Sequence, residues 1–133
     1  MIDLDTVMPG SALYDFGDAI RSGAASVIED DPNYDQVRVD LELFEAFTEG
    51  YLSELRDVLT PEELEWLPLS AKVITCEQAM RFLTDYIDGD LYYRIRTPDH
   101  NLVRARNQIA LVRDMERNFD RMQAICRKYA AKG

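Results

Sequence analysis

The 133-residue sequence predicts an all-α fold, a helical domain of about five helices with a short N-terminal strand remnant. Apolar residues recur every three or four positions along most of the chain, which is the pattern of helices with one buried face. Capping residues and prolines stand before several of these segments, as at helix starts. The composition, 47% hydrophobic and 30% charged, suits a core with a solvated shell. No repeat or Gly/Ser linker divides the chain, so residues 1–133 are expected to form a single helical domain.

The first third of the chain predicts one short strand and one helix. Residues 1–5 alternate in polarity and are followed by the turn sequence Met8-Pro9-Gly10, as a strand remnant would be. A helix is then expected over residues 12–22, with Ser11 as its N-cap. Its apolar positions are Leu13, Phe16 and Ile20. A polar loop over residues 24–36 follows.

The middle of the chain predicts three helices. Asp40 caps the first, whose apolar stripe comprises Phe44, Phe47, Tyr51, Leu55 and Val58. The run Thr60-Pro61-Glu62-Glu63 has the form of a capping box and starts the second helix, which Pro68 is expected to end. A third helix of about five turns is expected over residues 70–88. Its apolar positions are Val73, Ala79, Met80, Leu83 and Ile87.

The last third predicts the longest helix, over residues 98–130. Its apolar stripe comprises Ile109, Val112, Met115, Phe119, Met122, Cys126 and Tyr129. Cys76 and Cys126 lie in apolar helical patterns without the close spacing of zinc or disulfide frameworks, so both are expected to be reduced core residues. His100, the only histidine, is expected to be a solvated residue of the first turn.

Charge excludes two classes of partner. The 25 acidic and 15 basic side chains give a net charge of −10, concentrated in residues 1–60. Such a surface repels phosphate backbones and anionic lipid, so neither nucleic acid nor a membrane surface is an expected partner. No apolar run approaches the ~18 residues that span a bilayer, and no signal-peptide pattern opens the chain. The expected location is cytoplasmic.

Acidic side chains crowd the N-terminal end of the chain. Asp3 and Asp5 lie in the strand remnant, and Asp15 and Asp18 lie in the helix that follows. Carboxylates at a strand end and on a neighbouring helix suit a magnesium site. The simpler interpretation is a solvated acidic face, and the residues alone do not decide between the two.

A family resemblance bears on these acids. Ile2–Ser11, which spells IDLDTVMPGS, and Tyr14–Arg21, which spells YDFGDAIR, resemble the aminoglycoside phosphotransferase/choline kinase superfamily, in its N-acetylhexosamine kinase-like branch. Met80–Tyr86 and Gly89–Tyr92 resemble the same branch, so the likeness covers most of the chain. It implies the helical part of the C-terminal lobe of a kinase-like phosphotransferase.

The resemblance implies roles for four residues near the N-terminus. Asp3 matches the aspartate that binds the Mg²⁺ bridging the nucleotide phosphates, with Asp5 beside it as a second metal residue and Thr6 at the substrate. Asp15 matches an aspartate that supports the catalytic loop by hydrogen bonding. The triplet Asp15-Phe16-Gly17 also spells a protein-kinase metal motif, but that motif follows a strand, whereas this one follows a helix start.

Two later residues match sugar-binding positions of the branch. Arg81 and Tyr92 correspond to an arginine and a tyrosine that contact the sugar, and both side chains can hydrogen-bond hydroxyl groups. Simpler roles are equally open here. Arg81 can pair at i,i+4 with Glu77 or Asp85, and Tyr92 can be a rim aromatic beside Tyr93.

The parts that catalyse phosphoryl transfer are not found in this sequence. A His-x-Asp loop should precede Asp3, and the glycine-rich loop, the phosphate-gripping lysine and the adenine hinge are also missing. The expected function is therefore that of a C-terminal fragment of a sugar-directed, Mg²⁺- and ATP-dependent phosphotransferase. The fragment has no complete catalytic set, is inactive alone and holds neither Mg²⁺ nor ATP tightly.

Other functions stay open beside this one. The chain could be a non-catalytic helical interaction module, or a partner subunit completed by a separate chain that carries the missing kinase lobe. A stand-alone metal-binding protein built on the four N-terminal aspartates is a third hypothesis. Because Ile2, Leu4, Val7 and Leu13 would need cover, a homodimer is expected, with an interface over residues 1–13 and part of the last helix.

Overall fold

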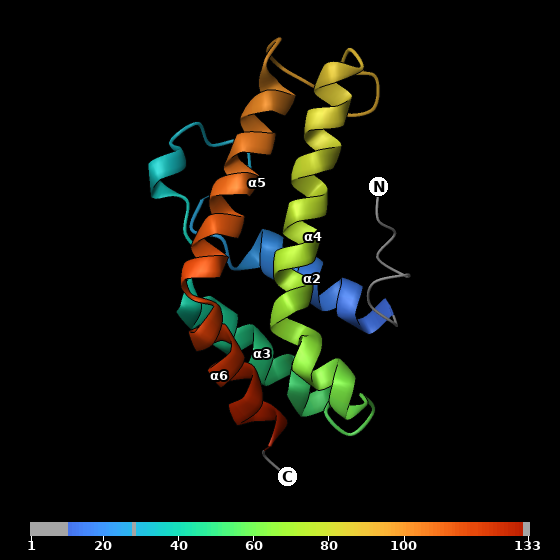
Figure 1. The fold of residues 1–133 in the computed structure, drawn as a ribbon, viewed down its shortest axis with the longest axis vertical. Coiled ribbons are helices and arrows are strands. Elements are labelled where there is room, and N and C mark those ends of the chain that lie inside the picture. Colours follow the sequence, from blue (N-terminus) through green and yellow to red (C-terminus); the bar gives the residue numbers. More distant parts are fainter. Residues whose placement is uncertain (1–10, 28, 132–133) are drawn as a thin grey trace.

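The fold is helical throughout the part that the computed structural model describes, which is residues 11–27 and 29–131. Within these residues the chain forms five α-helices and a 3-10 turn, η1 (Figure 1). Their bounds are α2 (Ser11–Gly23), η1 (Tyr34–Gln36), α3 (Leu41–Leu55), α4 (Pro61–Ile87), α5 (His100–Arg117) and α6 (Phe119–Ala130). The predicted all-α class is confirmed, and the expected strand remnant at residues 1–5 lies outside the described residues.

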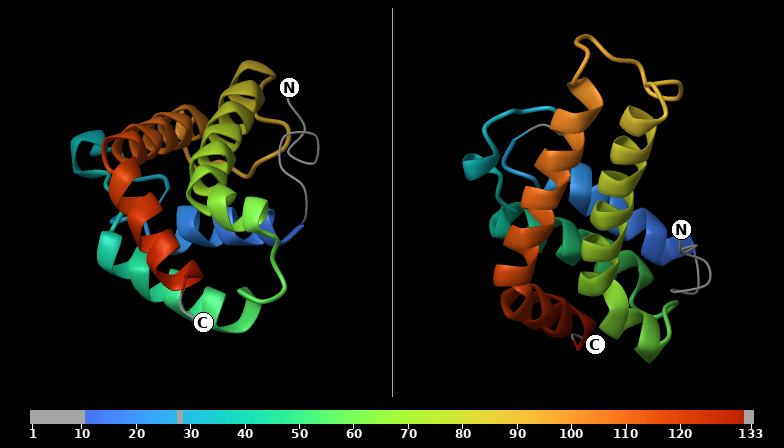
Figure 2. Two further views of the ribbon diagram at one scale, coloured as in Figure 1. Left: turned by 60° about the horizontal axis from the view of Figure 1, so that its bottom comes forward. Right: turned by 45° about the horizontal axis from the view of Figure 1, so that its top comes forward.

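Two long helices form the axis of the molecule. α4 and α5 run antiparallel and pack along their lengths, and α2 crosses α4 (Figure 1). α3 and α6 pack against each other where α5 ends (Figure 2). The core lies where all five described helices converge, and it covers Leu13, which was expected to need cover from a second copy of the chain. Its largest fully buried apolar side chains include Leu13, Phe16, Ile20, Phe44, Leu52, Leu67, Leu111, Met115 and Met122.

The N-cap signal places α3 correctly, and α2 covers the expected residues 12–22, although Ser11 is its first helical residue and not its N-cap. The Asp40 carboxylate accepts hydrogen bonds from two backbone N–H groups of the first turn of α3, as the predicted N-cap should. The predicted stripe is only partly right, because Phe44 is buried whereas Phe47 and Val58 are 40% and 72% exposed. Val58 lies beyond the end of α3 at Leu55, so helical phase no longer decides which way it points.

The prediction that Pro68 ends a helix is wrong. The capping box at Thr60 and Glu63 forms as expected, but the helix it starts runs through Pro68 to Ile87 and is the longest described. A proline inside a helix costs about 3 kcal/mol, because it removes one hydrogen bond and crowds the preceding turn. Pro68 is itself buried, as is the adjacent Leu67. Burial of this face offsets the cost of the proline.

The buried face of α4 also differs from the predicted one. Met80, Leu83 and Ile87 are 52%, 38% and 72% exposed. Of the predicted positions Ala79 is buried, and the other buried apolar residues are Leu67, Ala71, Ile74 and Phe82. α4 packs against α2 on one side and α5 on another, so small side chains at the crossings are covered while several large ones are not.

The expected helix over residues 98–130 is two helices. It is interrupted at Asn118, whose side chain donates to the Asp114 carbonyl at 2.9 Å and so competes with the helical ladder. Met115, Met122, Cys126 and Tyr129 are buried as predicted, whereas Ile109 is 39% exposed.

The two cysteines have different environments. Both are free thiols, but Cys76 is exposed, so the prediction that it belongs to the core is wrong. It lies on α4 and lines an apolar groove with Met80 and Leu83 of the same helix. Cys126 is buried, and this burial raises the pKa of its thiol to about 12, with a smaller contribution from Glu65. Cys126 is therefore an inert core residue.

Gly17 allows α2 and α4 to approach closely. A Cβ atom at this position would lie 2.6 Å from the Ser70 carbonyl oxygen and would also collide with the Ile74 side chain. Part of the triplet that resembles a kinase metal motif is thus explained by helix packing.

Replacing Gly17 by alanine is expected to destabilise the fold by about 1–3 kcal/mol, because the backbone of α4 must move. Gly50→Ala is the matched control, since a Cβ there meets nothing within 4 Å and alanine is favoured in a helix. Thermal unfolding should give a lower Tm for Gly17→Ala and an equal or higher Tm for Gly50→Ala. A Gly17→Ala protein as stable as the control would contradict this packing argument.

Candidate functional site

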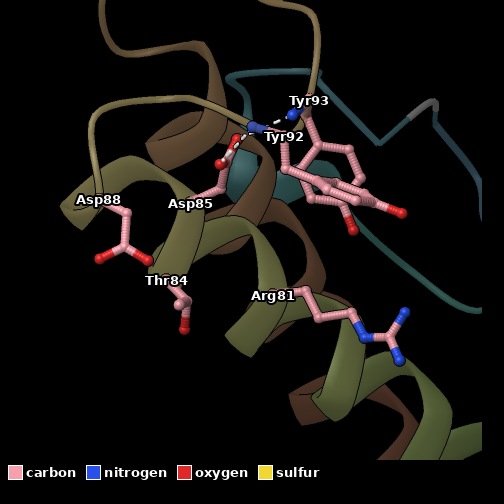
Figure 3. Close-up of a pocket in the computed structure, with 6 residues that line it drawn as sticks. All are labelled: Arg81, Thr84, Asp85, Asp88, Tyr92 and Tyr93. Atoms are coloured by element: carbon pink, nitrogen blue, oxygen red, sulfur yellow. Dashed lines mark hydrogen bonds between the residues drawn. The ribbon is translucent and has the colours of Figure 1, made fainter.

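The candidate site is a hollow of about 360 Å³ where α4 ends and the chain turns toward α5 (Figure 3). Its walls are Arg81, Thr84, Asp85, Asp88, Tyr92 and Tyr93. The first three lie on α4 and Asp88 is its C-cap, so the four residues stand at positions i, i+3, i+4 and i+7, which share one helix face. The two tyrosines come from the loop that follows, and their rings project on the same side as the Arg81 side chain (Figure 3).

Asp85 fixes this loop onto the helix. Its two carboxylate oxygens accept the backbone N–H groups of Tyr92 at 2.7 Å and Tyr93 at 2.9 Å. The Asn101 side-chain amide of α5 donates to the same carboxylate at 2.8 Å. Burial raises the pKa of Asp85, but these hydrogen bonds to the charged form together outweigh burial and lower it. Asp85 is therefore an ionised anchor whose lone pairs are largely committed within the protein.

The turn after α4 needs unusual backbone conformations. Gly89 has φ +97° and Asp90 has φ 62°, so two successive residues adopt left-handed geometry. The Asp90 N–H donates to the Asp85 carbonyl at 2.7 Å, and its carboxylate accepts from Asn101 at 3.0 Å. Glycine and aspartate tolerate this geometry better than most residues, which explains why the chain reverses here.

The two tyrosine side chains of the loop differ in how firmly the rest of the protein holds them. The Tyr93 ring lies 4.8 Å from the Phe82 ring, and its hydroxyl accepts from Gln78 at 3.0 Å. The Tyr92 ring stands edge-on to Tyr93 with centroids 4.8 Å apart, and this residue is 80% exposed. Tyr93 is thus held in place, whereas Tyr92 offers its ring to a ligand.

Arg81 forms the simpler of the contacts expected for it. Its guanidinium pairs with the Glu77 carboxylate at 2.7 Å, at the i,i+4 spacing. Burial lowers the pKa of Arg81, but Glu77 and the Tyr14 and Tyr93 phenols outweigh that effect and raise it. The guanidinium is permanently charged and can donate from its remaining N–H groups to a ligand in the hollow.

His100 is not the solvated residue expected from the sequence. It is 7% exposed, and its Nδ1 accepts the Arg96 backbone N–H at 3.1 Å. The proton therefore resides on Nε2, which donates to the Asp30 carboxylate at 3.0 Å. His100 thus links the loop before α3 to the start of α5, and both of its ring nitrogens take part in hydrogen bonds.

The structure brings together two of the residues that the sequence singled out. Arg81 and Tyr92 line the same hollow. Asp15 is an exposed residue of α2 that does not line it, and Asp18 pairs with Arg21 at 3.1 Å. The remaining predicted site residues, Asp3, Asp5 and Thr6, lie outside the described residues.

Four residues of the hollow were not predicted as site residues, namely Thr84, Asp85, Asp88 and Tyr93. The helical spacing from Arg81 could have found the first three. Between Ser11 and Ala131, leaving out residue 28, no group of three or more His, Cys, Asp or Glu side chains is placed to hold a metal ion. At this hollow the described part of the chain offers hydrogen bonding and aromatic contact.

Over the described ranges, no helix is both long and apolar enough to cross a bilayer. No family model matches the sequence.

Proposed function

We propose that the hollow at the end of α4 binds a sugar, and that the chain supplies the acceptor-binding part of a kinase-like phosphotransferase. One observation carries the proposal. Arg81 on α4 and Tyr92 on the following loop, which the family resemblance implies as sugar contacts, line one hollow. Nothing in local sequence requires residues from a helix and a loop to share a wall.

The chemistry of the walls supports a polyhydroxylated ligand. The exposed Tyr92 ring presents an apolar face to the C–H groups of a sugar ring. Arg81 donates hydrogen bonds, Asp88 accepts them, and the Thr84 hydroxyl does both, so alternating ring hydroxyls can be satisfied in direction as well as number. A volume of about 360 Å³ suits a small molecule.

The residues around the hollow support ligand binding, and the proposal does not assign catalysis to this chain alone. Phosphoryl transfer needs a residue that orients the acceptor hydroxyl and groups that neutralise the phosphates. The one histidine is engaged by Asp30 and Arg96, and the Asp85 carboxylate is engaged by the loop. In this proposal ATP, Mg²⁺ and a His-x-Asp loop come from another part of the enzyme or from a separate chain. ATP turnover by this chain alone at rates on the order of 1–100 s⁻¹ would contradict it.

Titration with N-acetylglucosamine or N-acetylgalactosamine, followed by saturation-transfer NMR and calorimetry, tests the proposal. We expect millimolar affinity and about a five- to tenfold loss with Tyr92→Ala, because an aromatic face contributes about 1 kcal/mol. Leu91→Ala is the matched control, since Leu91 is 84% exposed in the same loop and does not line the hollow. No saturable binding, or an equal loss in the control, would contradict sugar recognition at this site.

A second candidate function is that of a non-catalytic helical module that self-associates. Met80 and Leu83 of α4 and Ile109 of α5 line an apolar groove of about 340 Å³, and all three are more than a third exposed. A second copy of the chain, related by a twofold axis, would cover this face with the same side chains. Light scattering at tens of micromolar should then give twice 15.3 kDa, and Leu83→Asp should restore the monomer mass. A wild-type monomer would exclude this candidate.

A further inference from the structure

A second hollow lies on another side of α5, away from the proposed sugar site. It measures about 470 Å³ and forms where η1 and the chain after it pack against α5. Figure 1 shows η1 on the side of α5 that faces away from α4. The walls are Tyr34, Asp35, Arg38, Ala110, Arg113 and Arg117.

Three arginines meet at this hollow in a chain of strongly negative net charge. Arg113 and Arg117 lie one turn apart on α5, and Arg38 reaches them from the segment after η1. Among the lining residues the one carboxylate is Asp35, and Asp114 is buried beside the hollow. Cationic side chains thus outnumber anionic ones here, whereas the whole sequence has 15 basic and 25 acidic residues.

Asp114 holds two of the arginines from the protein side. Its side chain is 5% exposed, and one oxygen accepts the Val39 backbone N–H at 2.7 Å. The other oxygen lies 3.2 Å from Arg117 Nη2 and 3.8 Å from Arg38 Nε. Because this carboxylate is fixed by the backbone, both guanidinium groups are positioned before any ligand arrives, which lowers the entropy lost on binding.

Most of the donors at this hollow remain available. Each guanidinium carries five N–H groups. Apart from the contacts with Asp114, Arg38 uses one donor on the Val37 carbonyl at 2.8 Å. Within residues 11–27 and 29–131, the Arg113 side chain has no ion pair or hydrogen bond. Arg38 and Arg117 are about half exposed, so their free N–H groups are open to solvent.

We propose that this hollow binds the phosphate group of a small phosphate ester. A tetrahedral dianion offers oxygens in several directions, which matches guanidinium groups that come from two elements and two turns of a helix. A carboxylate, in contrast, is satisfied by one guanidinium group, whose two parallel N–H groups match its two oxygens. Tyr34 forms the wall against which the organic part of the ester lies. This site is separate from the sugar hollow and does not depend on the function proposed for it.

Calorimetric titration of the full chain with phenyl phosphate, supported by ³¹P NMR, tests the site. We expect saturable one-to-one binding with a Kd of about 1 mM or tighter. Arg113→Gln should weaken it at least tenfold, and it should not unfold the protein because Arg113 is exposed. Tyr92→Ala should leave it unchanged, which separates this site from the sugar hollow.

Two controls decide whether the arginines act as a site. Arg106→Gln removes another exposed arginine of α5 that does not line the hollow, and we expect no effect. Equal weakening by Arg106→Gln, or no saturation by about 20 mM, would overturn the proposal. Inorganic phosphate should bind no tighter than phenyl phosphate. Binding of inorganic phosphate alone would overturn the assignment of an ester.

Discussion

Replacing Phe16 by alanine is expected to destabilise the protein by about 3–5 kcal/mol. Phe16 has no exposed surface, and its ring lies 6.1 Å from that of Phe44 and 5.1 Å from that of Tyr51, between centroids. Alanine would leave a cavity between α2 and α3 that rigid neighbours cannot fill. A domain of this size has about 5–15 kcal/mol of total stability, so urea unfolding should show a much lower midpoint.

Phe47→Ala is the control for this effect. Phe47 belongs to the same aromatic cluster, with its centroid 5.8 Å from that of Phe16, but it is 40% exposed. Its replacement is expected to cost about 1 kcal/mol, because less apolar surface leaves the core. Equal costs for the two replacements would show that Phe16 is not the centre of the cluster.

Asp85→Asn is expected to lower the Tm by about 5–10 °C and to abolish the sugar binding proposed for the hollow. The amide can accept with one oxygen, but its NH₂ group would face a backbone N–H of Tyr92 or Tyr93. One donor of the loop would then lose its partner, and Tyr92 would no longer be held at the hollow. Asp88→Asn changes an exposed carboxylate of the same hollow and should leave the Tm unchanged. A Tm unchanged by Asp85→Asn would contradict the anchoring role.

The same anchor makes the stability of the wild type depend on pH. The folded-state pKa of Asp85 lies below its ordinary value of 3.8. Its contribution to stability is therefore present above that value and is lost as the pH falls through the lower folded-state pKa. Unfolding between pH 5 and pH 2 should show the difference in stability between wild type and Asp85→Asn shrinking with acidification. A constant difference would mean that the charge of Asp85 is not involved.

Local chemistry made the starts of α3 and α4 predictable, and tertiary packing made the rest of the fold harder to predict. Asp40 and the pair Thr60 and Glu63 cap their helices through contacts within three residues, which sequence spacing reveals. Pro68 was expected to end a helix because a proline is unfavourable there. Whether burial offsets that cost depends on what packs against it, and no local pattern contains that information.

The candidate site shows the same limits. Arg81 and Tyr92 were found through the family resemblance, whereas periodicity alone left simpler roles open for both. Asp85 was considered only as a helix partner of Arg81, because its actual partners are the backbone N–H groups of a loop and the Asn101 amide. The pattern of side chains in a sequence does not reveal which backbone N–H groups a carboxylate will accept hydrogen bonds from. The arginine hollow also escaped prediction, since Arg38 meets Arg113 and Arg117 only through the fold.

The hydrogen bond from the Asn101 amide to the Asp85 carboxylate bears on the order in which the helices come together during folding. These residues are 16 positions apart, so closing the loop between them costs little chain entropy. α2 meets α4 only after the chain has returned through α3, which is a longer search. Contacts that are short in sequence form first in helical proteins. The α4–α5 hairpin is therefore expected to form early in folding and to bring Arg81 and Tyr92 together before the remaining helices dock.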